Sequence, residues 1–471
     1  MADVHNGSGL RTVHDAAELE PVATRPGLVG DTVAAVAATS SWAPTIASDA
    51  DVIAVVSNRS GEPRLWLCPL DGTDPTLLNT GVDPVLRVDW SPDGTWLAYL
   101  VAPGGGARTE IWLIRPDGGD TRQIAGFGET SATFGRWSDD GAWLTVAEAD
   151  RHSGRNVAYL IEPATGQRRV LASADILSAL DVSADHRHAL VRRGPRSARW
   201  LEVVEVATGD RWRLPTRERG AGAVGDAPAS TDIGHFSADG ATVYARTDAG
   251  RDLAALAALP TDDPDGGPQL IAARDDAELE SFTVSADRTT ACLLWNVNGG
   301  CSDVTLLDLR TGAERPLPAR PGDVISWCAL SVNGDRLAFT AESPTHPRNI
   351  WMMETGAAAP EPVTYSPPEM LPPAPLHPEL RRFHARDGLE ITGWLYRTDA
   401  AAPAPTVIYL HGGPEAQERP AFNSLFRALV ARGLTVFALN VRGSSGFGRA
   451  FVNADNLDGR YEAIADVAAA V

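Results

Sequence analysis

The chain has 471 residues, of which 44% are hydrophobic and 22% are charged, a composition typical of a globular protein rather than a disordered or fibrous one. Its length exceeds what one hydrophobic core supports, so we expect several domains, a repeated structural unit, or both. The 61 acidic and 41 basic residues give a formal net charge of -20, which repels phosphate backbones and anionic membrane surfaces. Neither nucleic acid nor a membrane is therefore an expected partner.

Two further global features concern the compartment. No apolar run approaches the roughly 18 residues of a membrane span, and the first residues lack a basic segment leading into an apolar one. The cysteines stand singly in apolar stretches, without the close spacing of a zinc or redox site. We expect a cytoplasmic protein with free thiols, no metal and no cofactor, while homo-oligomer formation stays open. The cysteines are Cys68, Cys292, Cys301 and Cys328.

Residues 1–40 carry no motif and are interpreted as an N-terminal extension, and an internal repeat follows them. A serine, a turn and an apolar strand recur at a spacing of roughly 43 to 54 residues, the length of one four-stranded propeller blade. The clearest copies are WSPDGTWLAY at 90–99 and WSDDGAWL at 137–144. The seven serines of the repeat, including weaker copies and a degenerate first one, are Ser48, Ser91, Ser138, Ser183, Ser237, Ser285 and Ser331.

Each repeat has the local chemistry of a β-hairpin. Asp-Gly supplies a turn with positive φ, and the alternation after it supplies a half-buried strand. A second strand and turn follow, for example at 110–114 and 304–308, and no long helical pattern interrupts residues 45–355. We therefore predict an all-β, seven-bladed β-propeller over 41–355. The repeated serine turns indicate fold rather than chemistry.

The composition changes to alanine and proline near residue 356, which predicts a linker over 356–378. Over 379–471, strand and helix patterns alternate, as in a parallel sheet covered by helices. We predict strands at 391–396, 406–410 and 435–439, a helix of about fifteen residues near 421–431, and another helix from residue 461.

Two loops of this last segment carry the chemical signal. The first, HGGP, follows a predicted strand, where glycines let backbone N–H groups approach a substrate carbonyl and stabilise a tetrahedral intermediate. The second is NVRGSSGFGR at 440–449, which follows the next strand. The candidate residues of the first loop are His411, Gly412, Gly413 and Pro414, and those of the second are Asn440, Arg442, Gly443 and Ser444.

This order of strands and loops after a seven-bladed propeller resembles the prolyl oligopeptidase family of serine peptidases, especially its acylaminoacyl-peptidase and dipeptidyl-peptidase-like branches. The resemblance implies the N-terminal part of an α/β-hydrolase domain over 379–471 and a serine peptidase that hydrolyses short peptides, with the propeller as a substrate filter. It assigns 411–414 to the oxyanion loop and gives 440–444 a supporting role beneath the site.

The resemblance also predicts a Gly-x-Ser-x-Gly elbow, an acid and a histidine, in that order. The 471 residues contain no such elbow, and no histidine follows His411. We therefore expect the nucleophile, acid and base beyond Val471, and a fragment of a longer peptidase. A nucleophilic pair of His411 with Ser444 or Ser445 is disfavoured, because no third group is evident to orient the histidine.

Two alternatives come from other classes: a catalytically dead propeller that binds a partner, and a pseudoenzyme that lost its catalytic half. The two loops argue against a pure binding propeller, which has no use for them at this spacing. The sequence does not distinguish removal of acylated residues, release of dipeptides and internal cleavage. His186 and His188 have the spacing of a metal pair on a strand, but we interpret them as exposed strand residues.

Overall fold

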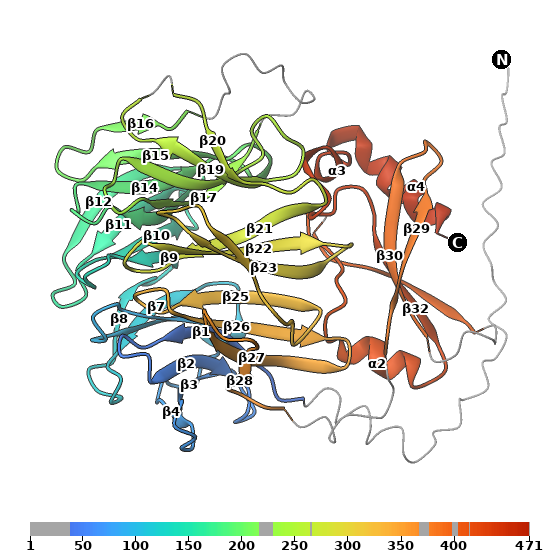
Figure 1. Ribbon diagram of the computed structural model, residues 1–471, viewed down its shortest axis with the longest axis horizontal. Helices are drawn as coiled ribbons and strands as arrows, with labels where there is room; N and C mark the ends of the chain where they lie inside the picture. The colour runs from blue at the N-terminus through green and yellow to red at the C-terminus, as the bar shows by residue number, and fades with distance from the viewer. Residues whose placement is uncertain are drawn as a thin grey trace, which may run out of the picture.

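The computed structural model describes residues 38–215, 229–263, 266–366, 376–397, 404–413 and 415–470. It contains seven antiparallel four-stranded sheets, in which consecutive strands pair in chain order, and one further sheet at the C-terminal end. Figure 1 shows the seven sheets together on one side and the eighth beside them. The predicted seven-bladed propeller is therefore confirmed.

The blades follow one another along the chain, and each begins with its inner strand. Blades 1 to 4 consist of β1 (Ser41–Ile46), β2 (Val52–Ser57), β3 (Arg64–Pro69), β4 (Thr76–Leu77), β5 (Val85–Trp90), β6 (Leu97–Val101), β7 (Glu110–Ile114), β8 (Arg122–Ala125), β9 (Thr130–Trp137), β10 (Leu144–Asp150), β11 (Asn156–Ile161), β12 (Arg168–Ala174), β13 (Leu177–Val182), β14 (His188–Arg193), β15 (Trp200–Glu205) and β16 (Arg211–Arg213).

Blades 5 to 7 consist of β17 (Thr231–Phe236), β18 (Thr242–Thr247), β19 (Ala255–Pro260), β20 (Gln269–Ala272), β21 (Ala277–Val284), β22 (Thr290–Val297), β23 (Cys301–Asp308), β24 (Glu314–Pro316), β25 (Val324–Leu330), β26 (Arg336–Ser343), β27 (His346–Glu354) and β28 (Glu361–Pro362). The last strand of blade 7 thus lies within the range predicted as a linker. Two short 3-10 turns, η1 (Pro103–Gly105) and η2 (Arg196–Ala198), lie in loops.

The repeated serine fixes the turn between the first two strands of a blade. In blade 2 the Ser91 hydroxyl donates to Asp93 (2.6 Å) and accepts the backbone N–H of Trp96 (2.9 Å). The same pair of contacts recurs at Ser138, Ser183, Ser237, Ser285 and Ser331. These serines therefore satisfy backbone groups in buried turns, as a structural role requires.

Blade 1 corrects the sequence interpretation by one residue. The backbone bonds of its turn run from Ala47 to Val52 and from Ala50 to Ala47, matching those that Ser91 makes in blade 2. Ala47 therefore occupies the serine position, and Ser48 is exposed. The degenerate sequence of this copy hid the shift, because the alanine offers no hydroxyl to mark the position.

The first and last blades close the ring through side chains, since each keeps its own four strands. Ile53 and Val55 of blade 1 share a hydrophobic cluster with Ala338 and Ile350 of blade 7. The hydroxyl of Ser366 also donates to the carbonyl of Thr39 (2.6 Å). Of the predicted N-terminal extension, residues 1–37 lie outside the described residues.

The C-terminal sheet has the order β29-β30-β32-β31 and is mixed. The prediction of a parallel sheet is confirmed for β31 and β32, which pair in parallel. It is wrong for the rest of the sheet, because β29 and β30 form an antiparallel hairpin and β30 pairs antiparallel with β32. The hairpin has a short turn at Asp387-Gly388, with Gly388 at φ 88°, so no crossover helix is needed. The strands are β29 (Glu379–His384), β30 (Glu390–Tyr396), β31 (Thr406–Leu410) and β32 (Thr435–Asn440).

Short helices accompany this sheet. The predicted first helix is shorter than expected, because Asn423 caps it by accepting from the backbone N–H groups of Leu425 and Phe426. Phe426 then packs against Trp394 and Tyr396 of β30. Among the described residues, no helix is long and apolar enough to span a membrane. The helices are α2 (Ser424–Val430), α3 (Arg449–Val452) and α4 (Arg460–Ala469), with the 3-10 turn η4 (Leu457–Gly459) before α4.

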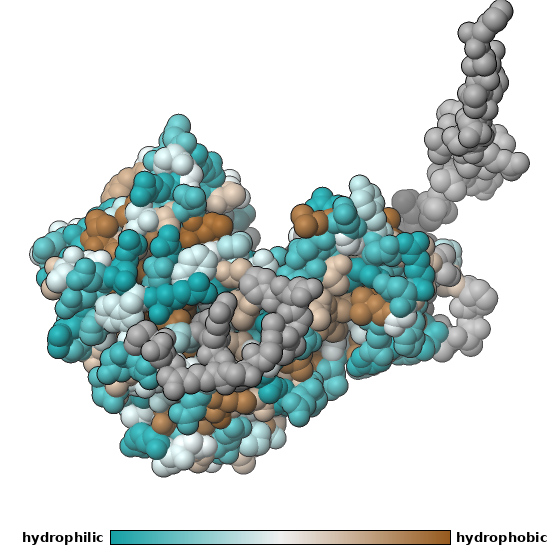
Figure 2. Space-filling model, turned by 90° about the horizontal axis from the view of Figure 1, so that it is seen from above, coloured by the Kyte–Doolittle hydropathy of each residue, from teal (hydrophilic) through white to brown (hydrophobic). Residues whose placement is uncertain are grey.

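Figure 2 shows two lobes joined by a narrower waist, with the propeller as the larger lobe and the C-terminal sheet as the smaller one. Polar contacts join them. Arg419 donates to Glu280 (2.8 Å), and the indole of Trp394 donates to the carbonyl of Gly299 (3.0 Å). Backbone N–H groups of the C-terminal segment also donate to carboxylates of the propeller, as Ala450 does to Asp252 (2.7 Å). The C-terminal sheet and its loops therefore pack against one end of the propeller.

Candidate functional site

The structure brings the two predicted loops together at the end of the parallel strand pair. His411 directly follows β31, and its Nε2 lies 2.9 Å from the hydroxyl of Ser444, which follows β32. Parallel neighbouring strands end at the same edge of a sheet, so two loops that follow them meet. Pro414 lies outside the described residues.

The glycines of the first loop are open to their surroundings. Gly412 and Gly413 are exposed, and no atom lies within 4 Å of the place where a Cβ would stand on either of them. Gly413 has φ 57°, a conformation that favours glycine. The loop therefore leaves room for a ligand to approach its backbone, as the oxyanion prediction requires.

Ser444 is unsuited to act as a nucleophile. Its side chain is fully buried, and its hydroxyl donates to the carbonyl of Val441 (2.6 Å). The contact with His411 therefore needs a hydrogen on Nε2 of the imidazole, which is compatible with a neutral ring, because burial lowers the pKa of His411. The pair connects the two loops rather than activating a serine, in agreement with the sequence argument against it.

Arg442 anchors the second loop from below. Its guanidinium forms paired contacts with Asp466 of α4 (2.9 and 2.7 Å) and with Asp387 of the β29–β30 turn (2.8 and 3.1 Å). The hydrogen bonds from Arg442 lower the pKa of Asp387 to about 2. One side chain thus joins a hairpin, a loop and a helix that lie far apart in the sequence.

Asn440 fixes the segment that follows the first loop. Its side-chain oxygen accepts the N–H of Glu418 (2.7 Å), and its side-chain nitrogen donates to the carbonyl of the same residue (3.0 Å). The N–H of Ser445 donates to the carbonyl of Ala416 (3.0 Å). Gly443 has φ 93°, and a Cβ there would lie 2.4 Å from the carboxyl carbon of Asp455, so a side chain is excluded. The two loops therefore form one cross-linked unit.

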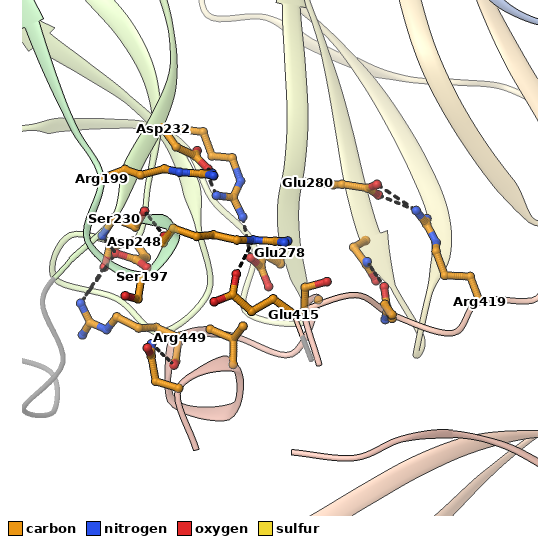
Figure 3. A pocket seen from close by; sticks show the side chains of 18 residues that line it. Ser197, Arg199, Ser230, Asp232, Asp248, Glu278, Glu280, Glu415, Arg419 and Arg449 are labelled. Carbon is orange, nitrogen blue, oxygen red and sulfur yellow. Dashed lines mark hydrogen bonds and ion pairs between the residues drawn. The ribbon is translucent and has the colours of Figure 1, made fainter. Parts of the chain in front are cut away.

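A cavity of about 360 Å³, which we call the interface cavity, lies between these loops and the propeller (Figure 3). Charged side chains make up most of its wall, and the two signs occur in equal number. The five arginines are Arg196, Arg199, Arg246, Arg419 and Arg449, and the five carboxylates are Asp232, Asp248, Glu278, Glu280 and Glu415. Each of these arginines forms an ion pair with one or two of these carboxylates.

Burial raises the pKa of two carboxyl groups in the wall of the interface cavity. Desolvation raises the pKa of Asp248 to about 6, although the N–H of Ser230 and the charge of Arg449 oppose the change. Desolvation likewise raises the pKa of Glu278, whose carboxylate accepts the N–H of Gly448 (3.1 Å). Carboxyls with such shifts inside a cleft are typical of functional sites, and they are also found in structural ion networks.

The propeller contributes wall residues that the sequence reasoning missed. Glu278 and Glu280 alternate with apolar residues at the start of the inner strand β21, and Arg196 lies in η2 between β14 and β15. The sequence signal for these wall residues was the pair of acidic residues at the start of an inner strand. That pair could not be assigned to a site without knowing which end of the propeller the C-terminal sheet covers.

His186 and His188 do not form a metal pair. Nε2 of His186 lies 3.2 Å from Asp140, whereas the ring of His188 packs edge-on against Trp212. Their positions differ because His186 occupies the turn, with φ 59°, and His188 begins β14. The prediction of exposed strand residues is therefore wrong in part, because His188 lies in a strand but His186 does not, and both side chains are half-buried.

Comparison with known proteins finds peptidases among the similar sequences and the similar folds. No family model matches the chain. The chain is 27% identical over 243 residues to dipeptidyl aminopeptidase BIII of Pseudoxanthomonas mexicana, a match that covers 48% of this chain and 34% of the relative. It is 35% identical over 80 residues to the uncharacterized peptidase YuxL of Bacillus subtilis (strain 168), covering 16% of this chain and 12% of that one. These matches thus span about a third or less of the relatives' own length.

Solved structures share the fold over almost the whole chain. A prolyl endopeptidase superposes with a TM-score of 0.76 at 18% identity, covering 95% of this chain and 68% of that one. The acylaminoacyl peptidase of Pyrococcus horikoshii superposes with a TM-score of 0.65 at 15% identity, covering 92% and 70%. The fold is that of peptidases with a β-propeller, and the relatives that match parts of the chain are named as peptidases. Within that class, the predicted resemblance to the prolyl oligopeptidase family is confirmed.

Proposed function

We propose that this chain supplies the propeller and the oxyanion-loop half of a serine peptidase that hydrolyses short peptides. One observation carries the proposal: a charged cavity lies where the propeller faces the loops that follow β31 and β32. Glu415 of its wall stands two residues after Gly413, so the cavity adjoins the exposed glycines. A ligand in it would contact the propeller and the segment that directly follows the candidate oxyanion loop.

The size of the interface cavity supports short peptides as the substrate class. About 360 Å³ lies at the low end of small-ligand sites and cannot hold a folded domain. Paired charges along its wall suit the alternating donors, acceptors and termini of a peptide. The propeller would then exclude large substrates because it covers the cavity.

The chemistry requires groups outside the candidate loops. We propose that residues 379–471 form the first part of an α/β-hydrolase domain and that the nucleophile, acid and base come from further chain. The propeller at 41–355, the linker at 356–378 and the extension at 1–40 complete the proposed domain organisation. Free cysteines support a cytoplasmic location, because reducing compartments keep thiols unpaired.

The proposal is tested on the native protein. Its intact mass is measured, and the same preparation is assayed with acetyl-alanyl, alanyl-prolyl and blocked internal-proline peptides that release a chromophore. We expect a mass above that of 471 residues and turnover of one of these substrates. A native mass ending at Val471 together with absence of turnover would overturn the peptidase proposal.

A second candidate, a pseudoenzyme or binding protein, rests on the missing Gly-x-Ser-x-Gly elbow and the lack of a histidine after His411. It predicts saturable binding of a partner without turnover by the native product. The same preparation therefore distinguishes the two functions.

A further inference from the structure

The end of the propeller that points away from the interface cavity carries a second polar network. Two arginines at this end bond to blades that are not their neighbours. Arg136, in the inner strand of blade 3, donates to the carbonyls of Val284 (2.6 Å) and Ser285 (2.8 Å) in blade 6. In a ring of seven consecutive blades, blade 3 adjoins only blades 2 and 4. The Arg136 side chain must therefore reach across the central channel.

Arg288 crosses the channel in the opposite direction. It lies in the first turn of blade 6, and its guanidinium donates to Asp139 of blade 3 (2.7 Å) and to both oxygens of Asp181 of blade 4 (2.8 and 3.2 Å). It also donates to the carbonyls of Val182 (2.7 Å) and Phe236 (2.8 Å) in blades 4 and 5. One side chain thus joins four blades.

The network is shielded from water. The side chain of Asp181 is fully buried, and that of Arg288 is 1% exposed. Burial opposes ionisation of Asp181, but the charges of Arg288 and Arg136 and the hydrogen bonds lower its pKa below the ordinary value. Asp181 and Arg288 therefore both stay charged although they are buried.

Arg288 occupies a turn position with positive φ, which favours glycine. The equivalent position is glycine in blades 2, 3, 5 and 7, Ala50 in blade 1 and His186 in blade 4, whereas Arg288 occupies it in blade 6 with φ 57°. A side chain in this left-handed conformation costs roughly 1 kcal/mol, and a buried ion pair adds a desolvation penalty. Glycine would avoid both, so the arginine is explained by what its guanidinium reaches.

The network and the interface cavity lie at opposite ends of the same strand. Glu278, at the start of β21, lines the interface cavity, and Val284, at its end, accepts from Arg136. Six residues of strand separate the two ends by about 20 Å. A second cavity of about 210 Å³ lies beside the network and includes Arg136 and Ala286, and its wall shares no residue with that of the interface cavity.

We propose that Arg288, with Arg136, seals the central channel, so that ligands reach the interface cavity from the side, past the ion pair of Arg196 and Glu415. That pair joins η2 of the propeller to the loop after Gly413 (2.8 Å), and the Arg196 side chain is 53% exposed. An exposed pair contributes little stability and opens readily. This inference goes beyond the proposed function and does not require catalysis.

The test measures access to a cysteine placed in the interface cavity. Ser445→Cys is introduced into a chain carrying Cys301→Ser and Cys328→Ser, which leaves Cys68 and Cys292, both buried, as the remaining native thiols. The labelling rate is followed with a maleimide attached to a six-residue peptide. Because labelling needs no peptidase activity, failure of the seal and failure of the proposed function are separate results.

Three added substitutions distinguish the routes. Ala286→Trp narrows the far cavity and leaves both arginines of the network unsubstituted, and we expect an unchanged rate because that end is already closed. Arg196→Ala should raise the rate two- to fivefold. Arg288→Gly should raise the labelling rate by opening a second route through the central channel. Adding Ala286→Trp to that variant should remove the increase.

If Ala286→Trp alone slows labelling of the Ser445→Cys chain severalfold, the probe enters through the central channel. That result would overturn the proposal that the channel is sealed. An unchanged rate in a folded Arg288→Gly chain would overturn the assignment of Arg288. Should that variant fail to fold, the Ala286→Trp comparison still decides the route.

Discussion

The two ends of the propeller are built on different principles. At the far end, six of the seven blades present the same serine turn, and Arg288 and Arg136 connect the blades across the axis. At the near end, single residues such as Arg419 and Glu280 meet the loops of the C-terminal sheet. The repeated serine turns therefore form the propeller scaffold, whereas charged residues that do not repeat form the wall of the interface cavity.

The largest expected effect is at the far end. Arg288→Gly leaves Asp181 buried without its main partner, so we expect a loss of about 3–5 kcal/mol in the free energy of unfolding. Relief of the positive φ returns roughly 1 kcal/mol of this. Urea unfolding measures the change. The matched control is His186→Gly, at the same turn position of blade 4, where we expect no loss; equal losses would contradict a special role for Arg288.

Next in size is the anchor beneath the second loop. Arg442→Ala removes the partner of Asp466, whose side chain is fully buried, and should cost about 2–4 kcal/mol. Hydrogen exchange should show the loss in α4 and the β29–β30 hairpin, with the blades unaffected. Arg386→Ala removes an exposed pair with Glu462 and serves as control. Uniform loosening of the blades would contradict the separation of the two regions.

A smaller, pH-dependent effect belongs to Glu418. Burial raises the pKa of its carboxyl to about 7, so the folded state holds a proton that the unfolded state releases near its ordinary value of 4.5. Stability from this group is present below about pH 4.5 and is lost as the pH rises through 7. Glu418→Gln should therefore stabilise the protein above pH 7, by about 2 kcal/mol, and have little effect at pH 4. A pH-independent difference in melting temperature would contradict this assignment.

The smallest effect is expected for a single repeated turn. Ser91→Ala removes the acceptor of the Trp96 N–H and should cost about 1 kcal/mol. Ser48→Ala should change nothing, because Ala47 holds the equivalent position in blade 1. Thermal unfolding of the two variants compares them directly. A larger loss of stability for Ser48→Ala than for Ser91→Ala would contradict the assignment of Ala47 to the serine position of blade 1.

The contrast between repeated turns and unrepeated contacts also explains which parts of the fold could be predicted from the sequence. Asp-Gly turns and alternating strands act within a few residues, so the blades and the strands at 110–114 and 406–410 were predicted correctly. The strand β29 was missed, because its residues are mostly exposed and carry little apolar pattern. The contact of Asn296 with Gln417 (2.5 Å), which crosses the interface, has no local signal at all.

For the candidate site, the sequence located the loops but not their surroundings. Strand order brought His411 and Ser444 together, and that proximity could be expected from two neighbouring strands. The acids and arginines of the propeller wall depend on which end of the ring the sheet covers. That choice is made by long-range packing, which single-sequence patterns do not encode.

In the proposed function, the propeller covers a cavity sized for a short peptide beside the candidate oxyanion loop. The kcat/KM of the native protein should be measured on peptides that share one cleavable bond but increase in length from three to thirty residues. We expect hydrolysis that falls steeply with length and is absent for a folded protein carrying the same bond. Equal hydrolysis of long and folded substrates, or none of any length, would contradict it.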